Sequence, residues 1–351
     1  MSGSDQAYLN TRVTLLSLQL MSPETITALA RLPLAALAER LGMEALLDDA
    51  SRVTVRRRVL EQALLQTLLN EMSLLARPMI PMHRDLVRAW ARKFALSNLK
   101  TLIRGKLYAL DPQELHAHLF ELPEALRLPE ELPRAENVPE LLRQLESGPY
   151  HVIARQAREV YEQHREPFLI EAAIDQRYYA EIQRRIMGLD THHQDALRRL
   201  IGSELDCVAL LWLVRYRFSY RLSPSETYYR LVPSPRYLGR ERLLELVNLD
   251  SLEQVLAALP APLATAVQGC TSLAETQQRL ATYTLEERRW VLHQSQSAIA
   301  RALAYLMLRE SNLFVLFAIA QGRLLNCSDT LIEQALELVE PQAAPLERRA
   351  A

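Results

Sequence analysis

Glycine, cysteine and long apolar runs are all scarce in this chain of 351 residues. Nine glycines are too few for a fold rich in tight β-hairpins, whose turns need residues that tolerate positive φ. The abundant residues are instead leucine, alanine, glutamate and arginine, which favour helix. With 49% hydrophobic and 24% charged residues, the chain can bury a core. We therefore expect an ordered, all-α protein.

The three cysteines, Cys207, Cys270 and Cys327, are far apart and form no Cys-x-x-Cys pair. This pattern suggests neither a disulfide framework nor a cysteine zinc site, and it best fits reduced thiols in a cytosol. The longest apolar runs, residues 208–214 and 313–320, are well short of the ~20 residues of a spanning helix. A net charge of −1 gives no global attraction to nucleic acid or to an anionic membrane. We expect no membrane span and no nucleic-acid partner.

The common catalytic signatures are absent: there is no GxxxxGK[ST], GxGxxG, GxSxG or HExxH. The best metal candidate is the stretch Asp190–Asp195. Its adjacent histidines are expected to diverge around a helix, so that only an i, i+3 pair such as His192 and Asp195 could share a face. A solvated loop entering a helix is the favoured interpretation. We therefore predict no catalytic residue, no metal and no cofactor, and keep a cytosolic hydrolase using this stretch as a third hypothesis.

Two further polar clusters have simple explanations. In Glu114–His118 the polar residues are two apart, so they point to different sides of a helix. Glu171, Asp175 and Tyr179 recur on one helix face, where they are either catalytic carboxylates or a polar seam between helices. Without a nucleophile or metal partner nearby in sequence, the seam is favoured.

A helix with a cationic end occurs three times. The first, Leu86–Lys106, is predicted to stop at Gly105 in a left-handed conformation, with cations beside the negative end of the helix dipole. Counted back from its last cation, this segment aligns without a gap with two others. The aligned segments are Lys93–Lys106, Glu204–Arg217 and Glu310–Arg323.

The starts of the units also repeat, because a glutamate precedes a proline by nine residues three times. The pairs are Glu24 and Pro33, Glu140 and Pro149, and Glu253 and Pro262. Ser22 is predicted to cap the first of these helices, with Pro23 in its first turn. Starts at positions 24, 140 and 253 give a period longer than the ~20–50 residues of solenoid repeats. Three helical domains are therefore predicted.

We place the first helical unit with its N-terminal helix at residues 1–112, the second with its linker at 113–235, and the third at 236–335. The proline-bearing segments 111–139 and 221–250 are predicted to be ordered, because they carry aliphatic and tyrosine side chains that water would solvate poorly. Residues 336–351 are predicted to be a frayed tail.

The motifs Asn98–Lys106 and Asp175–Tyr179, together with the helix Glu204–Arg217, resemble the C subunit of bacterial and archaeal V/A-type rotary ATPases, which is related to the d subunit of eukaryotic vacuolar ATPases. The resemblance also includes Tyr8–Arg12 and Leu231–Leu238, so it covers nearly the whole chain. The chain departs from the pattern at Ala209, at Gln321 and at Ser234-Pro235.

This resemblance implies a non-catalytic, funnel-shaped socket of three pseudo-equivalent domains with pseudo-threefold symmetry. It would join the central rotor stalk to the membrane proteolipid ring on the cytoplasmic side of the plasma membrane, and couple ATP turnover to proton or sodium transport. The alternative is a generic helical scaffold or adaptor in the cytosol.

The three cationic helix ends are the candidate partner-binding site, because equivalent ends of three units could surround one axis. The opposing interpretation is that each cation only caps its own helix and pairs locally. The residues of this predicted basic ring are Arg104, Lys106, Arg215, Arg217 and Arg323.

Overall fold

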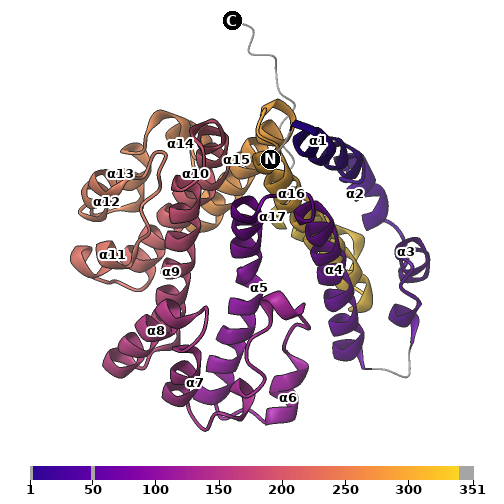
Figure 1. Cartoon of the computed structure of the whole chain (residues 1–351), viewed down its shortest axis with the longest axis horizontal. Helices are drawn as coiled ribbons and strands as arrows, with labels where there is room; N and C mark the ends of the chain where they lie inside the picture. Colours follow the sequence, from indigo (N-terminus) through magenta and orange to yellow (C-terminus); the bar gives the residue numbers. More distant parts are fainter. Residues whose placement is uncertain (1–2, 49–51, 340–351) are drawn as a thin grey trace, which may run out of the picture. The chain divides into compact units, whose positions relative to one another are not determined.

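The protein is described by a computed structural model over residues 3–48 and 52–339, in which there is no β-strand (Figure 1). The prediction of an all-α chain is confirmed. The α-helices are α1 (Gly3–Ser17), α2 (Pro23–Ala30), α3 (Leu34–Leu41), α4 (Val53–Ala76), α5 (Pro81–Leu107), α6 (Pro112–Ala117), α7 (Val138–Leu145), α8 (His151–His164), α9 (Pro167–Met187), α10 (Thr191–Val214), α11 (Pro224–Arg230), α12 (Arg240–Val247), α13 (Leu252–Ala257), α14 (Ala261–Ala266), α15 (Leu273–Gln294), α16 (Ala298–Leu324) and α17 (Asp329–Val339). Short 3-10 turns are η1 (Glu44–Leu47), η2 (Glu124–Leu126) and η3 (Leu132–Arg134), and a π-helical segment, η4 (Arg215–Ser219), continues α10.

The same order of helices occurs three times along the chain. Two short helices are followed by two long ones, in α2 to α5, α7 to α10 and α13 to α16. We call these groups the first, second and third repeats. Each opens with an N-cap whose side-chain oxygen accepts from the backbone N–H three residues later, which satisfies a donor that the helix leaves unpaired. The caps are Ser22, Asn137 and Ser251, so the predicted role of Ser22 is confirmed.

The chain forms two compact units. The larger contains the described residues of Met1–Ile80, Asp190–Pro224 and Pro233–Ala351, and the smaller contains Pro81–Leu189 and Ser225–Val232. The division into domains 1–112, 113–235 and 236–335 stays a prediction. Within the predicted tail, residues 336–339 belong to α17, whereas 340–351 lie outside the described residues.

The larger unit is built around α16, which packs against α1, α4, α15 and α17. Among the described helices it is the one long and apolar enough to cross a membrane by length and composition. However, 67% of its most apolar stretch is buried inside the protein. Its fully buried side chains include Leu303, Tyr305 and Ile319. Burying a large apolar side chain contributes about 1.5–3 kcal/mol to folding, so α16 acts as a core helix.

In the smaller unit, α5 packs on α9 and α7 packs on α8. Leu99, Ile103 and Ile174 are completely buried there. The segment between α6 and α7 is also ordered, because Leu122, Leu126 and Leu132 are buried. The predicted order of the first proline-bearing segment is thus confirmed. In the larger unit, Leu238 in the second such segment is buried as well.

From the sequence we expect one helix over residues 5–20 and a second one from Ser22 to Pro33, and both of these predicted ends are too late. The N-terminal helix ends at Ser17, since the next residues form turns and Leu18 has 78% of its surface exposed. The helix that begins after Ser22 ends at Ala30, and a new helix begins at Leu34 after Pro33. Proline cannot donate the backbone hydrogen bond that a continuous helix needs.

Candidate functional site: three repeated helix ends

The ends of α5 and α16 have the same backbone geometry. The residue after each cap, Ala109 or Asn326, is left-handed, with φ of 49° and 53°. One residue further on, Leu110 N–H donates to the Gly105 carbonyl, and Cys327 N–H donates to the Gly322 carbonyl, both at 2.9 Å. This is the Schellman pattern, which satisfies carbonyls at the end of a helix. The sequence repeat therefore extends to hydrogen-bonding detail.

The predicted stop at Gly105 is wrong. The helix continues to Leu107, and Gly105 is a buried residue inside it. A Cβ at this position would lie 2.5 Å from Cδ1 of Leu115, so the glycine leaves room for α6 to approach α5. At Gly322 a Cβ would lie 2.7 Å from Cγ1 of Ile332 on α17. Close packing of a following helix, instead of a left-handed turn, explains both glycines.

The second repeat ends differently. After α10 the chain enters the π-helical segment η4, in which Tyr220 N–H donates to the Arg215 carbonyl at 2.9 Å. The left-handed residue is Arg221, with φ of 56°, which follows the last cation, Arg217, by four residues. In the other two repeats the left-handed residue, Ala109 or Asn326, follows the last cation by three residues. The repeats therefore differ by one inserted residue, which the π turn absorbs.

The cations of the first repeat bind partners within the smaller unit. Arg104 donates two hydrogen bonds to the Glu171 carboxylate, at 2.5 and 2.6 Å, which raises the pKa of the guanidinium. Lys106 donates to the Pro133 carbonyl at 2.7 Å. Both side chains thus stabilise the unit that contains them.

The other predicted cations lie in the larger unit. Arg217 donates to the carbonyls of Val247 and Leu222 at 2.8 and 2.9 Å. Arg323 donates to the Ala30 carbonyl and forms an ion pair with Asp329, 2.7 Å away. Arg215 is exposed. The local pairing that we set against the basic ring thus occurs at four of the five predicted cations.

Exposed apolar side chains recur at these ends. The residue directly before the left-handed one is Tyr108, Tyr220 or Leu325, with 66%, 47% and 55% of its surface exposed, respectively. Single exposed apolar residues are common on proteins. An exposed apolar side chain that recurs at the same position of three repeats is a more specific signal of a binding surface. The sequence alignment did not reveal it, because the aligned segments end at the last cation, before these residues.

A polar seam joins α5 and α9 in the smaller unit. Lys100 donates to Asp175, next to the Arg104–Glu171 pair, and Arg92 lies 2.7 Å from Glu181. Burial raises the pKa of Asp175, while Lys100 opposes this shift. The prediction that Glu171 and Asp175 form a seam between helices is confirmed. Tyr178, the neighbour of Tyr179, also bonds across the seam, from its hydroxyl to the Trp90 carbonyl at 2.8 Å.

The larger unit has corresponding seams. Between α16 and α4, Glu71 accepts from Arg309 and from the Tyr305 hydroxyl. Between α10 and α15, Arg288 donates to Glu204 and Arg199 to Glu287. In each case the second long helix of one repeat packs on the first long helix of the next, in the order α5 on α9, α10 on α15 and α16 on α4.

Asp206 on α10 binds the segment 234–238, which belongs to the same larger unit. Its Oδ1 accepts from the backbone N–H groups of Tyr237 and Leu238 at 3.2 and 2.9 Å. Burial raises its pKa to about 6, although these hydrogen bonds and nearby Arg236 oppose the shift. Asp206 appeared in the family motif, but its sequence neighbours did not reveal its partners.

The stretch around His192 differs from the prediction in one respect. The rings of His192 and His193 do not diverge, because their centroids lie only 3.7 Å apart. Potential ligand atoms of Asp190, His192 and His193 lie within 4.8 Å of one another. This cluster opens α10, where the positive end of the helix dipole disfavours a cation. His193 Nδ1 also contacts the Ser297 hydroxyl at 2.8 Å, which fits a role in helix packing. The side chain of Glu114, in the other histidine-containing cluster, lies outside the described residues.

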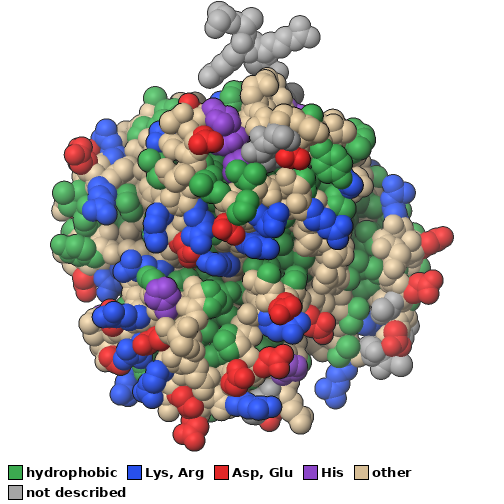
Figure 2. Space-filling view, in the orientation of Figure 1, with side chains coloured by type: hydrophobic (Ala, Val, Ile, Leu, Met, Phe, Trp, Pro, Cys, Tyr) green, Lys and Arg blue, Asp and Glu red, His purple; other side chains and the backbone are tan. Residues whose placement is uncertain are grey.

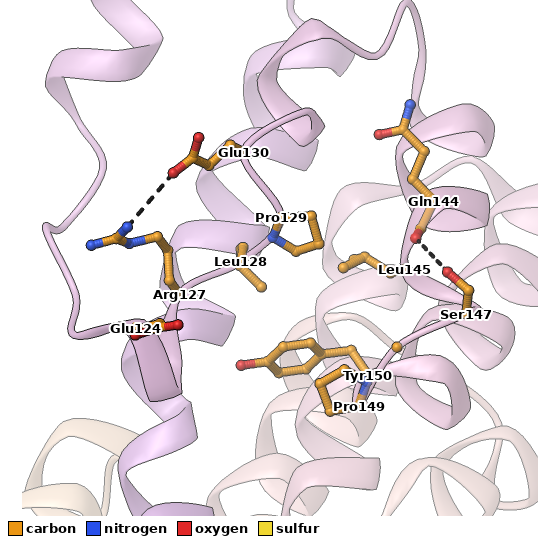
Figure 3. A pocket seen from close by; sticks show the side chains of 11 residues that line it. Glu124, Arg127, Leu128, Pro129, Glu130, Gln144, Leu145, Ser147, Pro149 and Tyr150 are labelled. Atoms are coloured by element: carbon orange, nitrogen blue, oxygen red, sulfur yellow. Dashed lines mark hydrogen bonds and ion pairs between the residues drawn. The ribbon is translucent and has the colours of Figure 1, made fainter.

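A pocket of about 490 Å³ lies in the smaller unit, next to η2 and to the turn between α7 and α8 (Figure 3). Leu128, Leu145 and Tyr150 give it an apolar lining, and Arg127 and Glu130 form an ion pair 3.6 Å long at its edge. No histidine or cysteine lines the pocket. Its lining combines apolar side chains with an ion pair at the edge.

The surface carries charges of both signs. Lys and Arg side chains are interspersed with Asp and Glu over the face in Figure 2. Together with the polar seams and the repeated helix ends, this defines a class of protein: an all-α protein built from helical repeats.

The family follows from sequence comparison. The ATP synthase (C/AC39) subunit family matches residues 9–335, and the chain belongs to this family. The C subunit of the A-type ATP synthase of Methanocaldococcus jannaschii is 27% identical over 177 residues, which are 50% of this chain and 44% of the relative. The match thus spans less than half of that relative. Family membership confirms the resemblance found in the sequence.

Proposed function

We propose that this protein is the non-catalytic central-stalk socket of a V/A-type ATP synthase or ATPase. It joins the rotor stalk to the membrane proteolipid ring on the cytoplasmic side of the plasma membrane. Its three repeats form a funnel with pseudo-threefold symmetry, and its rotation couples ATP turnover to proton or sodium transport. Family membership supports the complex, and the structural features below support the role within it.

The observation that carries the proposal is the recurrence of the polar seams. A socket transmits torque without covalent bonds, so its helices must resist sliding along one another. Arg92 with Glu181 and Arg309 with Glu71 place charge-assisted hydrogen bonds across packed long helices. Bonds between the long helices of successive repeats fit a body that turns as one piece.

The candidates for contact with the stalk are the five predicted cations, Arg104, Lys106, Arg215, Arg217 and Arg323. Several weak contacts on one partner support one another through multivalency. Most of these cations are already paired within their own unit. We therefore propose that the stalk contacts Arg104, on its exposed side, and the exposed Arg215. The other three hold the helix ends in place.

The experiment is reconstitution of the purified chain with stalk subunits and the proteolipid ring. We expect the chain to co-purify with both, and the ion pumping per ATP hydrolysed to depend on its presence. The variant Arg104→Ala/Arg215→Ala should lower this coupling, whereas Arg184→Ala, an exposed arginine in the last turn of α9, should not. A chain that binds neither stalk nor ring contradicts the proposed function.

A further inference from the structure

The π-helical end of the second repeat is the one place where the three repeated helix ends differ in backbone. π turns are rare and occur often at functional positions. The extra residue delays the left-handed turn to Arg221, a non-glycine residue in a conformation that such residues seldom adopt. An α-helical end was available to this sequence pattern, because the first and third repeats use it. The insertion therefore requires a reason of its own.

The side chains at this end form a basic and aromatic surface. Arg215 and Arg221 are exposed, and neither makes a side-chain hydrogen bond or ion pair with another described residue. Tyr220 is 47% exposed between them in the sequence. Behind it, the rings of Trp212, Tyr216 and Tyr220 follow one another with centroids 6.2 and 6.3 Å apart. We call Arg215, Tyr220 and Arg221 the π-end patch.

The patch differs in charge from the other two ends. In the first repeat Arg104 is neutralised by Glu171, and in the third Arg323 is neutralised by Asp329. At the π-end patch, two cations remain for a partner. An exposed tyrosine flanked by arginines complements an acidic segment that also presents aliphatic side chains.

We propose that the π-end patch binds an acidic, amphipathic helical segment of the rotor stalk and fixes the rotational register of that stalk on the three repeats. This rests on the proposed socket function. In the proposed threefold socket, three alike helix ends would offer a stalk without threefold symmetry three equivalent orientations. One unlike end, with two cations and a displaced turn, selects one of them.

The test is the affinity of the full-length chain for the purified stalk subunits of the same complex. We expect Arg215→Glu/Arg221→Glu to weaken binding by about tenfold or more, as reversal of close charges across an interface does. Arg215→Lys/Arg221→Lys should retain most of the affinity. The matched control, Arg143→Glu/Arg184→Glu, makes the same charge change at exposed arginines in the last turns of α7 and α9 and should have no effect.

A one-residue deletion tests the register. Removing the exposed Ser219 should convert η4 to the α-helical end of the other repeats, with helix content by circular dichroism unchanged. Cross-links formed between a cysteine placed at Tyr220 and a series of cysteines along the stalk should then shift or disappear. Cross-links at the same stalk positions would overturn the role in register.

The outcomes separate the two proposals. If the unaltered chain does not bind the stalk, the proposed function itself fails. If it binds and the charge-reversed patch binds equally well, the patch is overturned while the socket stands. If the patch instead determines binding to vesicles of anionic lipid, and not to the stalk, a membrane surface is the partner and the inference is likewise overturned.

Discussion

Arg309 on α16 donates from Nε to both carboxylate oxygens of Glu71 on α4, at 3.1 and 3.2 Å. Arg92, at the same position of the first repeat, pairs with Glu181 on α9. In the second repeat α10 contributes charges of both signs, since its Arg199 donates to Glu287 on α15 and its Glu204 accepts from Arg288 on α15. Charge-assisted bonds thus join the long helices at all three contacts, and either helix can supply the cation.

Glu71→Ala should lower the free energy of unfolding by about 2–4 kcal/mol, because it leaves the largely buried Arg309 uncompensated and removes the acceptor of the Tyr305 hydroxyl. Urea unfolding monitored by circular dichroism measures this loss. The double variant Glu71→Leu/Arg309→Met, which removes both charges and keeps apolar volume, should recover most of it. A loss below about 0.5 kcal/mol for Glu71→Ala alone contradicts the importance of the seam.

Gly322→Ala should destabilise the protein by about 1–2 kcal/mol, because its Cβ would lie 2.7 Å from Cγ1 of the buried Ile332. Helix propensity alone predicts the opposite sign, a gain of about 1 kcal/mol. The sign of the change in thermal stability therefore decides between the two effects. The control adds the same methyl group in a chain that already carries Ile332→Ala. There Gly322→Ala should lower the stability by less than it does when Ile332 is present.

Asp206 should make stability depend on pH. Its pKa is raised to about 6 in the folded state, above its ordinary value of 3.8, so the folded protein holds this proton more tightly than the unfolded chain. The associated stabilisation is complete below pH ~4 and is lost as the pH rises through about 6, with a span of about 3 kcal/mol. Asp206→Asn should lack this component, which the difference between the two unfolding curves from pH 4 to 7.5 measures. A difference independent of pH would show that Asp206 ionises normally.

Arg323→Ala and Arg215→Ala should behave differently although the two residues occupy neighbouring positions of the repeat. Arg323 is largely buried and bonds to Ala30 and Asp329, so its loss should cost about 1–3 kcal/mol of unfolding free energy. Arg215 is exposed, and its loss should change stability by less than about 0.5 kcal/mol. Equal effects in chemical denaturation would mean that one of these side chains is held differently in solution.

Local features of the chain were predictable from sequence. Leucine-rich composition with little glycine gave the all-α fold, and Ser22 before Pro23 gave a helix start that the structure confirms. The seam could also be predicted, because Glu171 and Asp175 lie one helical turn apart and need cationic partners. Capping and helical periodicity depend on residues a few positions apart, so they are present in any short stretch of sequence.

Tertiary structure decided the rest. The sequence predicts that Gly105 ends a helix, whereas in the structure this glycine leaves space for the Leu115 side chain. The partners of Asp206 come from a segment distant in sequence, and the inserted residue at Arg215–Ser219 is absorbed by a π turn that the alignment of cations did not reveal. The sequence alone determined where helices form and which faces are polar. Only packing between distant segments decided which cations are neutralised and which remain exposed, because a side chain's neighbours depend on the whole fold.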